Sequence, residues 1–284
     1  MVTPLRRSVL STTVAEWRWP PPDLASVPDA VLLRPGGDLP AVRAIIDELA
    51  AWGVTCILDV ATDDVRRWID EGAAAFACRA EDAGDVAALD RAIEAAGGEA
   101  SIEVVVASAT AALRLREIAA ASDRVVSLIS SEAMLRVALG VAESDEVDAL
   151  AFARGQLVLV AAEHGLAAVG RFAPAGHHRA TAADITVERY CLSIGLHGGL
   201  CADWEQVARC NAGYAPDEAM VSHARRVLEA MAEAAREGKG AISLDGRMID
   251  IPFVRLSEGT LALAERTADR EQSLRARFGG PSDD

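Results

Sequence analysis

Three short stretches of this sequence carry charged side chains that could bind a ligand or move a proton. Arg79 and Glu81 stand two residues apart after an apolar run, and Glu132 follows two serines. An arginine in such a position can hold a carboxylate or a phosphate through two parallel hydrogen bonds, or it can form an ion pair with Glu81. Near the end of the chain, the polar segment 237–254 surrounds a D-G turn and carries Asp245, Arg247 and Asp250.

Other polar residues are weaker candidates. Neighbouring residues on a strand point to opposite sides, which disfavours a metal pair at His177 and His178. We expect these two residues to lie in an exposed loop after the apolar run 167–172. Ser130 and Ser131 lack a G-x-S-x-G context and are expected to be cap or polar loop residues. Glu132 is either an acid favoured by a helix N-terminus or a relocated metal ligand.

The composition limits the classes of function. The chain has 284 residues and a formal net charge of −15, which repels nucleic acids and anionic membranes, so we expect neither as a partner. The five cysteines are odd in number and form no C-x-x-C pair, which predicts buried thiols in a reducing compartment. Without an apolar signal run or a long apolar span, a cytoplasmic protein is expected.

Short β-rich runs alternate with helical patterns along most of the chain. The predicted strands cover residues 8–14, 30–35, 55–60, 74–79, 101–108, 124–130, 167–172 and 199–202. The predicted helices between them cover residues 39–53, 62–72, 82–96, 109–122, 146–164 and 183–195. This order predicts an α/β fold with a parallel sheet, and eight repeats are the number that closes a (β/α)8 TIM barrel. An open doubly wound sheet is the alternative, which the absence of G-x-G-x-x-G after the first strand disfavours.

The last part of the chain lies outside this count. A helix over 217–238, the polar hairpin and a helix over about 252–270 form a C-terminal helix–hairpin–helix extension. We expect a barrel over 1–215, the extension over 216–275 and a flexible tail over 276–284.

The segment APDEAMVSHARRVLEAMAEAAREGKGAISLDGRMIDIPFV closely resembles the C-terminal extension of the citrate-lyase-β-like branch of the HpcH/HpaI aldolase superfamily, which includes malyl-CoA lyases. Further agreement follows in order in RRSVL, EDAGDVAALD, LREIAAASDRVVSLI and ALAFARGQLVLVAAEHGL. The resemblance implies a TIM barrel assembled as a homotrimer or higher oligomer. It also implies that the extension reaches over the barrel mouth of a neighbouring subunit, where Asp250 takes part in catalysis.

The chemistry that the resemblance implies makes or breaks a C–C bond beside a thioester carbonyl, with Mg²⁺ as Lewis acid. The family ligand positions are occupied here by Ala107 and Met134, and neither side chain can hold a cation that takes oxygen ligands. Glu103 points to the same face as Ala107 but lies about 13 Å deeper, so we expect it to pair with an arginine.

Other family motifs at the strand ends differ too. RPGGD (34–38) lacks acidic residues at Gly36 and Gly37, and ILDV (57–60) lacks an arginine. DWEQ (203–206) brings in Trp204, which would narrow the pocket or pack against a partner chain. Arg79 stands in place of a family lysine, and its companion Glu81 is kept.

Changes confined to the C-terminal ends of barrel strands predict that the metal-dependent lyase reaction is lost. The expected catalytic residues are Asp250, Arg79 and Glu132. The expected substrate-binding residues are Arg79, Glu81 and Trp204. The expected partner is a small carboxylic acid or an acyl-CoA, with no metal cofactor. Two alternatives remain open, namely a catalytically silent binding or regulatory paralogue and a Mg²⁺-dependent lyase with relocated ligands.

Overall fold

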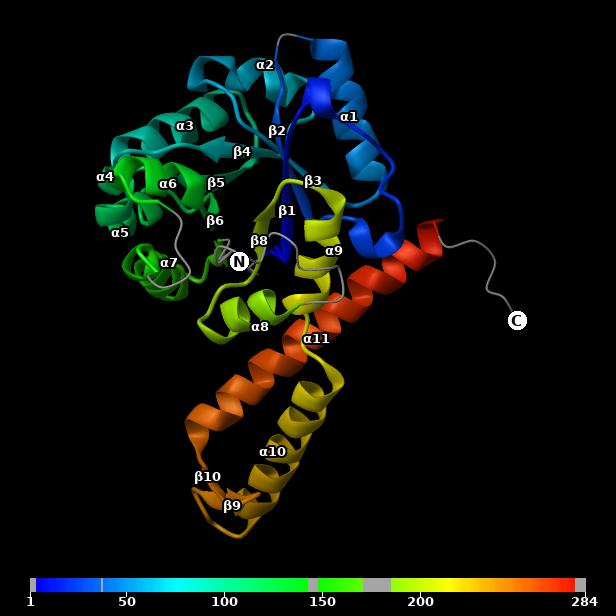
Figure 1. Cartoon of the computed structure of the whole chain (residues 1–284), viewed down its shortest axis with the longest axis vertical. Helices are drawn as coiled ribbons and strands as arrows, with labels where there is room; N and C mark the ends of the chain where they lie inside the picture. Colours follow the sequence, from blue (N-terminus) through cyan, green and yellow to red (C-terminus); the bar gives the residue numbers. More distant parts are fainter. Residues whose placement is uncertain (1–3, 37, 143–147, 171–184, 279–284) are drawn as a thin grey trace. The chain divides into compact units, whose positions relative to one another are not determined.

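The computed structural model describes residues 4–36, 38–142, 148–170 and 185–278. The chain divides into two compact units, Met1–Tyr214 and Ala215–Asp284. Figure 1 shows the first unit from blue to yellow-green and the second from yellow to red.

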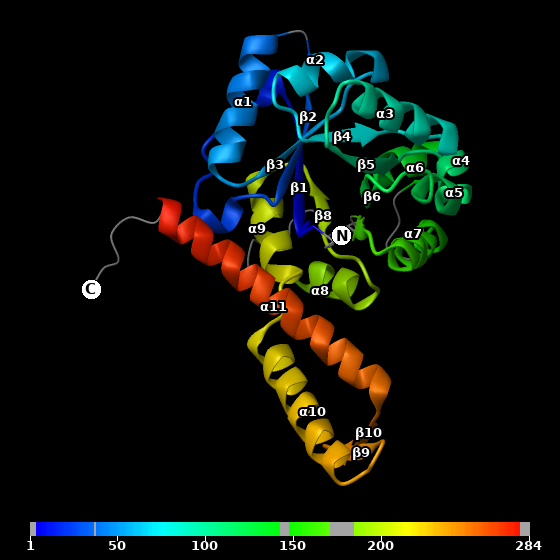
Figure 2. The same cartoon turned by 180° about the vertical axis from the view of Figure 1, so that it is seen from behind.

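The first unit is a barrel of parallel strands, as the alternating pattern predicts. Its strands are β1 (Ser8–Thr13), β2 (Ala30–Arg34), β3 (Thr55–Leu58), β4 (Ala75–Cys78), β5 (Ser101–Val106), β6 (Val125–Ser130), β7 (Ala167–Val169) and β8 (Gly199–Cys201). They follow the order β7-β6-β5-β4-β3-β2-β1-β8, and a parallel bridge between Val169 and Gly198 brings the two ends of the sheet together. Figure 2 shows strands β1 to β6 and β8 from behind, with helices around them. The expected TIM barrel is therefore confirmed.

Helices lie around the strands. They are α1 (Leu39–Ala51), α2 (Val65–Asp70), α3 (Ala83–Ala95), α4 (Ala109–Leu113), α5 (Leu115–Ala119), α6 (Glu132–Leu139), α7 (Ala151–His164), α8 (Thr186–Ser193) and α9 (Trp204–Gly213). Side-chain caps begin several of them: Asp38 accepts a bond from Ala41 N, and Asp82 forms a capping box with Asp85. Helix starts of this kind are local features, and the predicted boundaries of α1 and α3 are close to those observed.

The helical predictions need correction at three points. The single helix predicted over 109–122 is divided at Arg114, whose φ of −102° and ψ of 10° are not helical. The helices α6 and α9 were not among the predicted helices. Between β1 and β2 the connection carries only the short 3-10 turns Val14–Glu16 and Leu24–Ser26.

Small and branched side chains fill the barrel interior. One buried cluster contains residues from seven strands: Val9, Ala30, Leu32, Ile57, Ala75, Ala77, Val105, Ile129 and Val169. Because side chains alternate along a strand, a described residue two positions beyond a member of this cluster points toward the same interior. This alternation identifies which side chains at the C-terminal ends of the strands line the mouth of the barrel.

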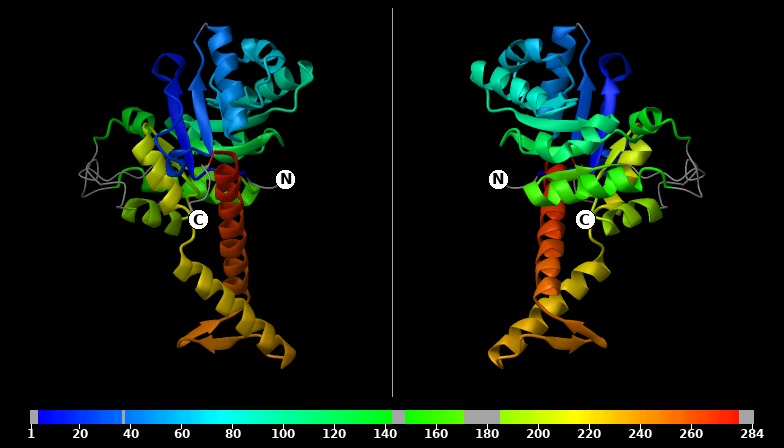
Figure 3. Two further views of the ribbon diagram at one scale, coloured as in Figure 1. Left: turned by 90° about the vertical axis from the view of Figure 1, so that its right-hand side faces the viewer. Right: turned by 90° about the vertical axis from the view of Figure 1, so that its left-hand side faces the viewer.

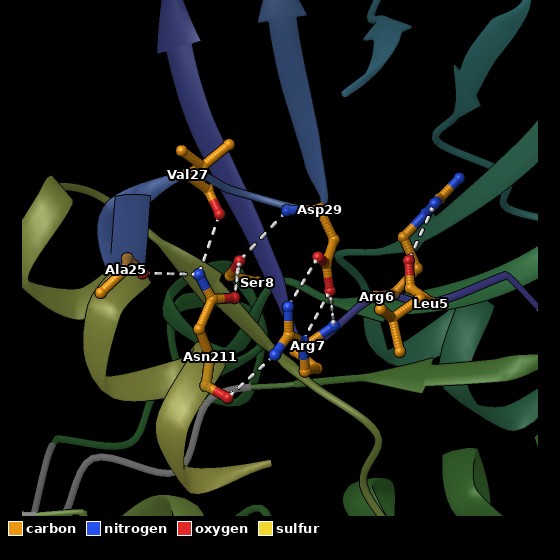
Figure 4. Close-up of polar contacts among 8 residues, drawn as sticks. All are labelled: Leu5, Arg6, Arg7, Ser8, Ala25, Val27, Asp29 and Asn211. Atoms are coloured by element: carbon orange, nitrogen blue, oxygen red, sulfur yellow. Dashed lines mark hydrogen bonds and ion pairs between the residues drawn. The ribbon is translucent and has the colours of Figure 1, made fainter. Parts of the chain in front are cut away.

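Charged residues are buried at the opposite end, the base of the barrel. Arg7 donates to both carboxylate oxygens of Asp29 at 3.2 Å each, and Ser8 Oγ donates to Asn211 Oδ1 at 2.7 Å (Figure 4). Asn211 Nδ2 donates in turn to the carbonyl oxygens of Ala25 and Val27. This network ties α9 and the β1–β2 connection to the start of the first two strands.

The second unit contains α10 (Glu218–Arg236), β9 (Ile242–Leu244), β10 (Arg247–Ile249) and α11 (Ile251–Phe278), which follow one another from yellow to red in Figure 3. The antiparallel hairpin turns at Asp245 and Gly246, whose φ angles of 53° and 77° suit an Asp-Gly turn. Helix α11 is longer than predicted, since it ends at Phe278 and includes the first residues of the expected tail.

Two further expectations concern the whole chain. Among the described residues, no helix combines the length and the apolar character needed to cross a bilayer. All five cysteines are buried thiols, and burial raises the pKa of Cys56 and Cys78 to about 12.

Candidate functional site

The mouth of the barrel is formed by residues that follow the interior cluster by two positions. Asp59 follows Ile57, Arg79 follows Ala77, and Ala107 follows Val105. On β2, Arg34 follows Leu32 in the same way and is the last residue of its strand. In a TIM barrel this end of the strands carries the chemistry, so these side chains define the candidate site.

Arg79 is held by an ion pair at the mouth. Its Nη2 lies 2.6 Å from Asp59 Oδ2, and its Nε lies 3.3 and 3.1 Å from the two Asp59 oxygens. The alternative of an ion pair between Arg79 and Glu81 is therefore not what the structure shows, because Asp59, directly after the neighbouring strand β3, takes that role. Arg79 remains 43% exposed, so its guanidinium can still meet a ligand.

Glu81 lies beside this pair and has partners of its own. Its carboxylate accepts a hydrogen bond from Ser108 Oγ at 2.7 Å, and its backbone N–H donates to Asp85 at 2.8 Å. Glu81 thus links the start of α3 to the start of α4. Its role in substrate binding stays a prediction.

Neither family ligand position offers an oxygen donor. Ala107 is half-buried directly after β5, and Met134 lies in α6 with 49% of its side chain exposed. A methyl group and a thioether do not coordinate Mg²⁺, which takes oxygen ligands.

Glu132, a predicted catalytic residue, is the first residue of α6 and is buried in an ion-pair network. Arg154 Nε lies 3.1 Å from Glu132 Oε1, and Arg154 Nη1 lies 2.6 Å from Asp148 Oδ2. Burial raises the pKa of the Glu132 carboxyl, and the opposing effect of Arg154 does not cancel the rise. Burial lowers the pKa of Arg154, but its bonds to Glu132 and Asp148 raise it more, so the guanidinium stays charged. The prediction that Glu132 lies at a helix N-terminus agrees with its place as the first residue of α6.

Glu103 lies at the base of the barrel and is fully buried. Arg6 Nη2 donates to its Oε1 at 2.7 Å, and Ser127 donates to its Oε2. The expected arginine pairing of Glu103 is confirmed, and no group remains on it for a metal ion at the mouth.

Trp204, the first residue of α9, packs in a cluster of half-buried tryptophans. Its ring lies 5.9 Å from that of Trp19 between centroids, and Trp19 also contacts Trp17 and Trp52, each at 5.3 Å. The contacts of Trp204 are therefore with the β1–β2 connection, and its expected place in the substrate pocket stays a prediction.

Asp250 lies in the second unit, directly before α11. Its backbone oxygen accepts from Phe253 and Val254 N–H groups, while its side-chain Oδ1 is buried and has no hydrogen-bond partner among the described residues. A buried acceptor without a partner is costly, and such groups recur at functional sites. The catalytic role predicted for Asp250 rests on the resemblance and stays a prediction.

Several positions of interest fall elsewhere. His177, His178 and Gly37 lie outside the described residues. Ser131 stands at the N-cap position of α6 without a capping bond from its side chain. A groove of about 530 Å³ lies at the base, where α5 and α7 end, and its ionisable lining residues are Asp123 and His164. That groove contains none of the predicted site residues.

The structure also adds residues that the sequence reasoning missed. Asp59 and Arg34 point into the mouth, and Arg154 holds Glu132. Strand alternation from Ile57 and Leu32 would have identified the first two. Arg154 could not be found in this way, because it pairs with a residue 22 positions earlier on another helix.

Known proteins that are similar to the chain are enzymes of one kind. It is 29% identical over 189 residues to the citrate lyase β subunit of Escherichia coli K12, which covers 66% of this chain and 62% of that protein. It is 30% identical over 210 residues to the L-malyl-CoA/β-methylmalyl-CoA lyase of Rhodobacter capsulatus, which covers 64% of each. The chain thus spans less than two thirds of the length of these relatives. No protein-family model matches it.

Solved structures support the fold. CitE of Mycobacterium tuberculosis, in complex with magnesium, acetoacetate and coenzyme A, gives a TM-score of 0.65 at 22% identity, covering 91% of this chain and 97% of that one. The citrate lyase β subunit of M. tuberculosis with oxaloacetate and magnesium gives 0.53 at 21% identity, covering 75% and 98%. Identities this low show a shared fold, while the two enzyme relatives confirm the resemblance carried by the sequence motifs.

Proposed function

We propose that this chain, as a relative of the citrate lyase β subunits and malyl-CoA lyases of the HpcH/HpaI aldolase superfamily, binds or acts on a small carboxylic acid or an acyl-CoA without a metal ion. The proposed site is the barrel mouth, around Arg79. The relatives are C–C lyases by name. The proposal is that the scaffold is kept while the metal-dependent step is lost.

The observation that supports this proposal most is the pair of side chains at the family ligand positions. Ala107 and Met134 provide no oxygen donor, whereas Mg²⁺ is normally held by one or two carboxylates. A single such change could be offset by a neighbouring group. Two changes in one small site remove both expected charges.

Two of the carboxylates that could replace them are already engaged. Both oxygens of Asp59 face Arg79, and both oxygens of Glu132 face Arg154. A metal ion would have to break an existing ion pair before it could bind either group. Glu81, which accepts from Ser108, leaves one carboxylate where the resemblance implies two, so the described residues at the mouth fit a magnesium ion poorly.

Asp250 is the second part of the proposal. We propose that a neighbouring copy of the chain supplies Asp250 to the mouth, within a homotrimer or a higher oligomer, where it acts as an acid or base. The family resemblance and the buried Oδ1 without a described partner support this role. Asp250→Asn would keep the volume and remove the proton-transfer capacity.

Isothermal titration calorimetry tests the metal-free site. The full chain is titrated with acetoacetate and with oxaloacetate, once in EDTA and once with millimolar Mg²⁺. We expect binding in EDTA, with an affinity that Mg²⁺ changes less than about threefold. Binding that requires Mg²⁺ would contradict the proposal and favour relocated ligands.

The double variant Ala107→Glu with Met134→Asp is the matched control. It should make acid binding depend on Mg²⁺ if only the ligands have been lost. Thermal unfolding of this variant must first show that it is folded. Thioester lysis by the variant, but not by the natural chain, would show that the rest of the catalytic machinery persists.

A further inference from the structure

Arg34 is a cation at the mouth that the family motifs do not explain. It ends β2, and it lies two residues beyond Leu32 of the interior cluster, so its side chain faces the mouth. The β1–β2 register places it opposite Thr13. Its side chain is exposed.

The partner nearest to Arg34 along the sheet is already engaged. Leu33 pairs with Leu58 in the β2–β3 register, so Arg34 stands level with Asp59, and adjacent strands are about 4.8 Å apart. Both oxygens of Asp59 nevertheless accept hydrogen bonds from Arg79. Within the described part of the chain, no carboxylate lies in ion-pair distance of Arg34.

The charged residues described at the mouth are not all paired in the same way. Arg79 is paired with Asp59, and Glu81 beside them accepts from Ser108, so Arg34 is left without a described carboxylate partner. Ala107, at the family ligand position, adds no carboxylate. A guanidinium binds a carboxylate with two parallel hydrogen bonds, and its charge does not depend on a metal ion.

We infer that Arg34 anchors the carboxylate of a small acid in a metal-free site at the barrel mouth. This inference rests on the proposed function and narrows its ligand class. One guanidinium without a carboxylate partner can hold one carboxylate of a ligand through two parallel hydrogen bonds. The several phosphates of an acyl-CoA would meet a chain of net charge −15 with little compensation.

A series of charge variants tests the inference by calorimetry in EDTA, with acetoacetate as the monoanion and oxaloacetate as the dianion. Arg34→Gln removes the guanidinium that has no described carboxylate partner and should weaken acetoacetate binding at least tenfold. Arg34→Lys keeps the positive charge but not the two parallel donors, so it should lose less acetoacetate affinity than Arg34→Gln. Asp59→Asn raises the mouth charge by one and should shift the preference toward oxaloacetate.

Arg91→Gln is the matched control, because it makes the same charge change on an exposed residue of α3. It should bind acetoacetate as the natural chain does. If Arg34→Gln also binds normally, the inference is overturned while the proposed function stands. If the natural chain binds neither acid, the proposed function itself fails. Thermal unfolding of each variant checks that a loss of binding is not a loss of structure.

Discussion

The two ends of the barrel use charged residues in different ways. At the base, Arg6, Arg7 and Glu103 are almost fully buried, and each has an oppositely charged partner. At the mouth, Arg79 is exposed to solvent. Arg34 also lies at the mouth, and it has no carboxylate partner in the described chain. Removing one member of a buried pair costs about 3–5 kcal/mol, whereas an exposed pair contributes about 0–1 kcal/mol. Stability therefore constrains the base, and residues at the mouth can change with little cost to the fold.

The largest expected effect is at the base. Glu103→Ala leaves the Arg6 guanidinium buried without its carboxylate and Ser127 without its acceptor. We expect the free energy of unfolding to fall by about 3–5 kcal/mol, measured by urea denaturation. Glu99→Ala, at an exposed position shortly before the strand that carries Glu103, is the control and should change stability by less than about 0.5 kcal/mol. A loss below about 1 kcal/mol in Glu103→Ala would break the contrast between the two ends.

A smaller effect is expected at Glu132, which is buried although it follows a strand at the mouth end. The pKa of its carboxyl in the folded state lies above the ordinary value of 4.5. The folded state therefore keeps a proton that the unfolded state releases, and the stability contributed by this group decreases as the pH rises from 4.5 through the raised pKa.

Urea denaturation over that pH range measures the effect. The difference in unfolding free energy between the natural chain and Glu132→Gln should decrease as the pH rises. A difference that does not vary with pH, or that increases, would show that Arg154 stabilises the carboxylate more than burial disfavours it.

A change in the exposed mouth pair should affect stability less. Arg79→Gln removes the partner of Asp59, and we expect a loss of about 0–1 kcal/mol in urea denaturation. Acid binding should respond far more than stability, because the same substitution removes a guanidinium from the proposed site. A loss near that of Glu103→Ala would mean that the mouth is structural as well.

The smallest effect is expected at the exposed pair of the second unit, which serves as a reference for solvent-exposed charges. Arg226 Nη2 lies 2.7 Å from Asp245 Oδ1, and this hydrogen bond lowers the pKa of the Asp245 carboxyl below its ordinary value of 3.8. The stabilisation is present above pH 3.8 and is lost as the pH falls through the lowered pKa. Arg226→Gln should return the pKa of Asp245 toward 3.8 in an NMR titration. An unchanged value would assign the shift to the turn rather than to Arg226.

The sequence predicted much of the fold because the relevant signals are local. Strand β5 contains four β-branched residues among its six, α3 begins with an aspartate cap, and Asp245-Gly246 specifies a two-residue hairpin turn. Each of these depends on residues close together in the chain. The break at Arg114 was missed, because the apolar spacing continues through it.

The candidate site was predicted only in part. The identities of Ala107 and Met134 follow from the sequence alone, and so does the chemical statement that they cannot hold a hard cation. The sequence alone does not identify Asp59 as the partner of Arg79, because Glu81 is closer to Arg79 along the chain.

The sequence by itself determined which side chains exist at the strand ends and which of them carry charge. Only the tertiary structure decided which of these charges meet, as in the pairs of Arg79 with Asp59 and Arg154 with Glu132. The reason is that strand register and helix packing place residues about twenty positions apart within hydrogen-bond distance. A charge left over after such pairing, as at Arg34, becomes visible only once the other partners are assigned.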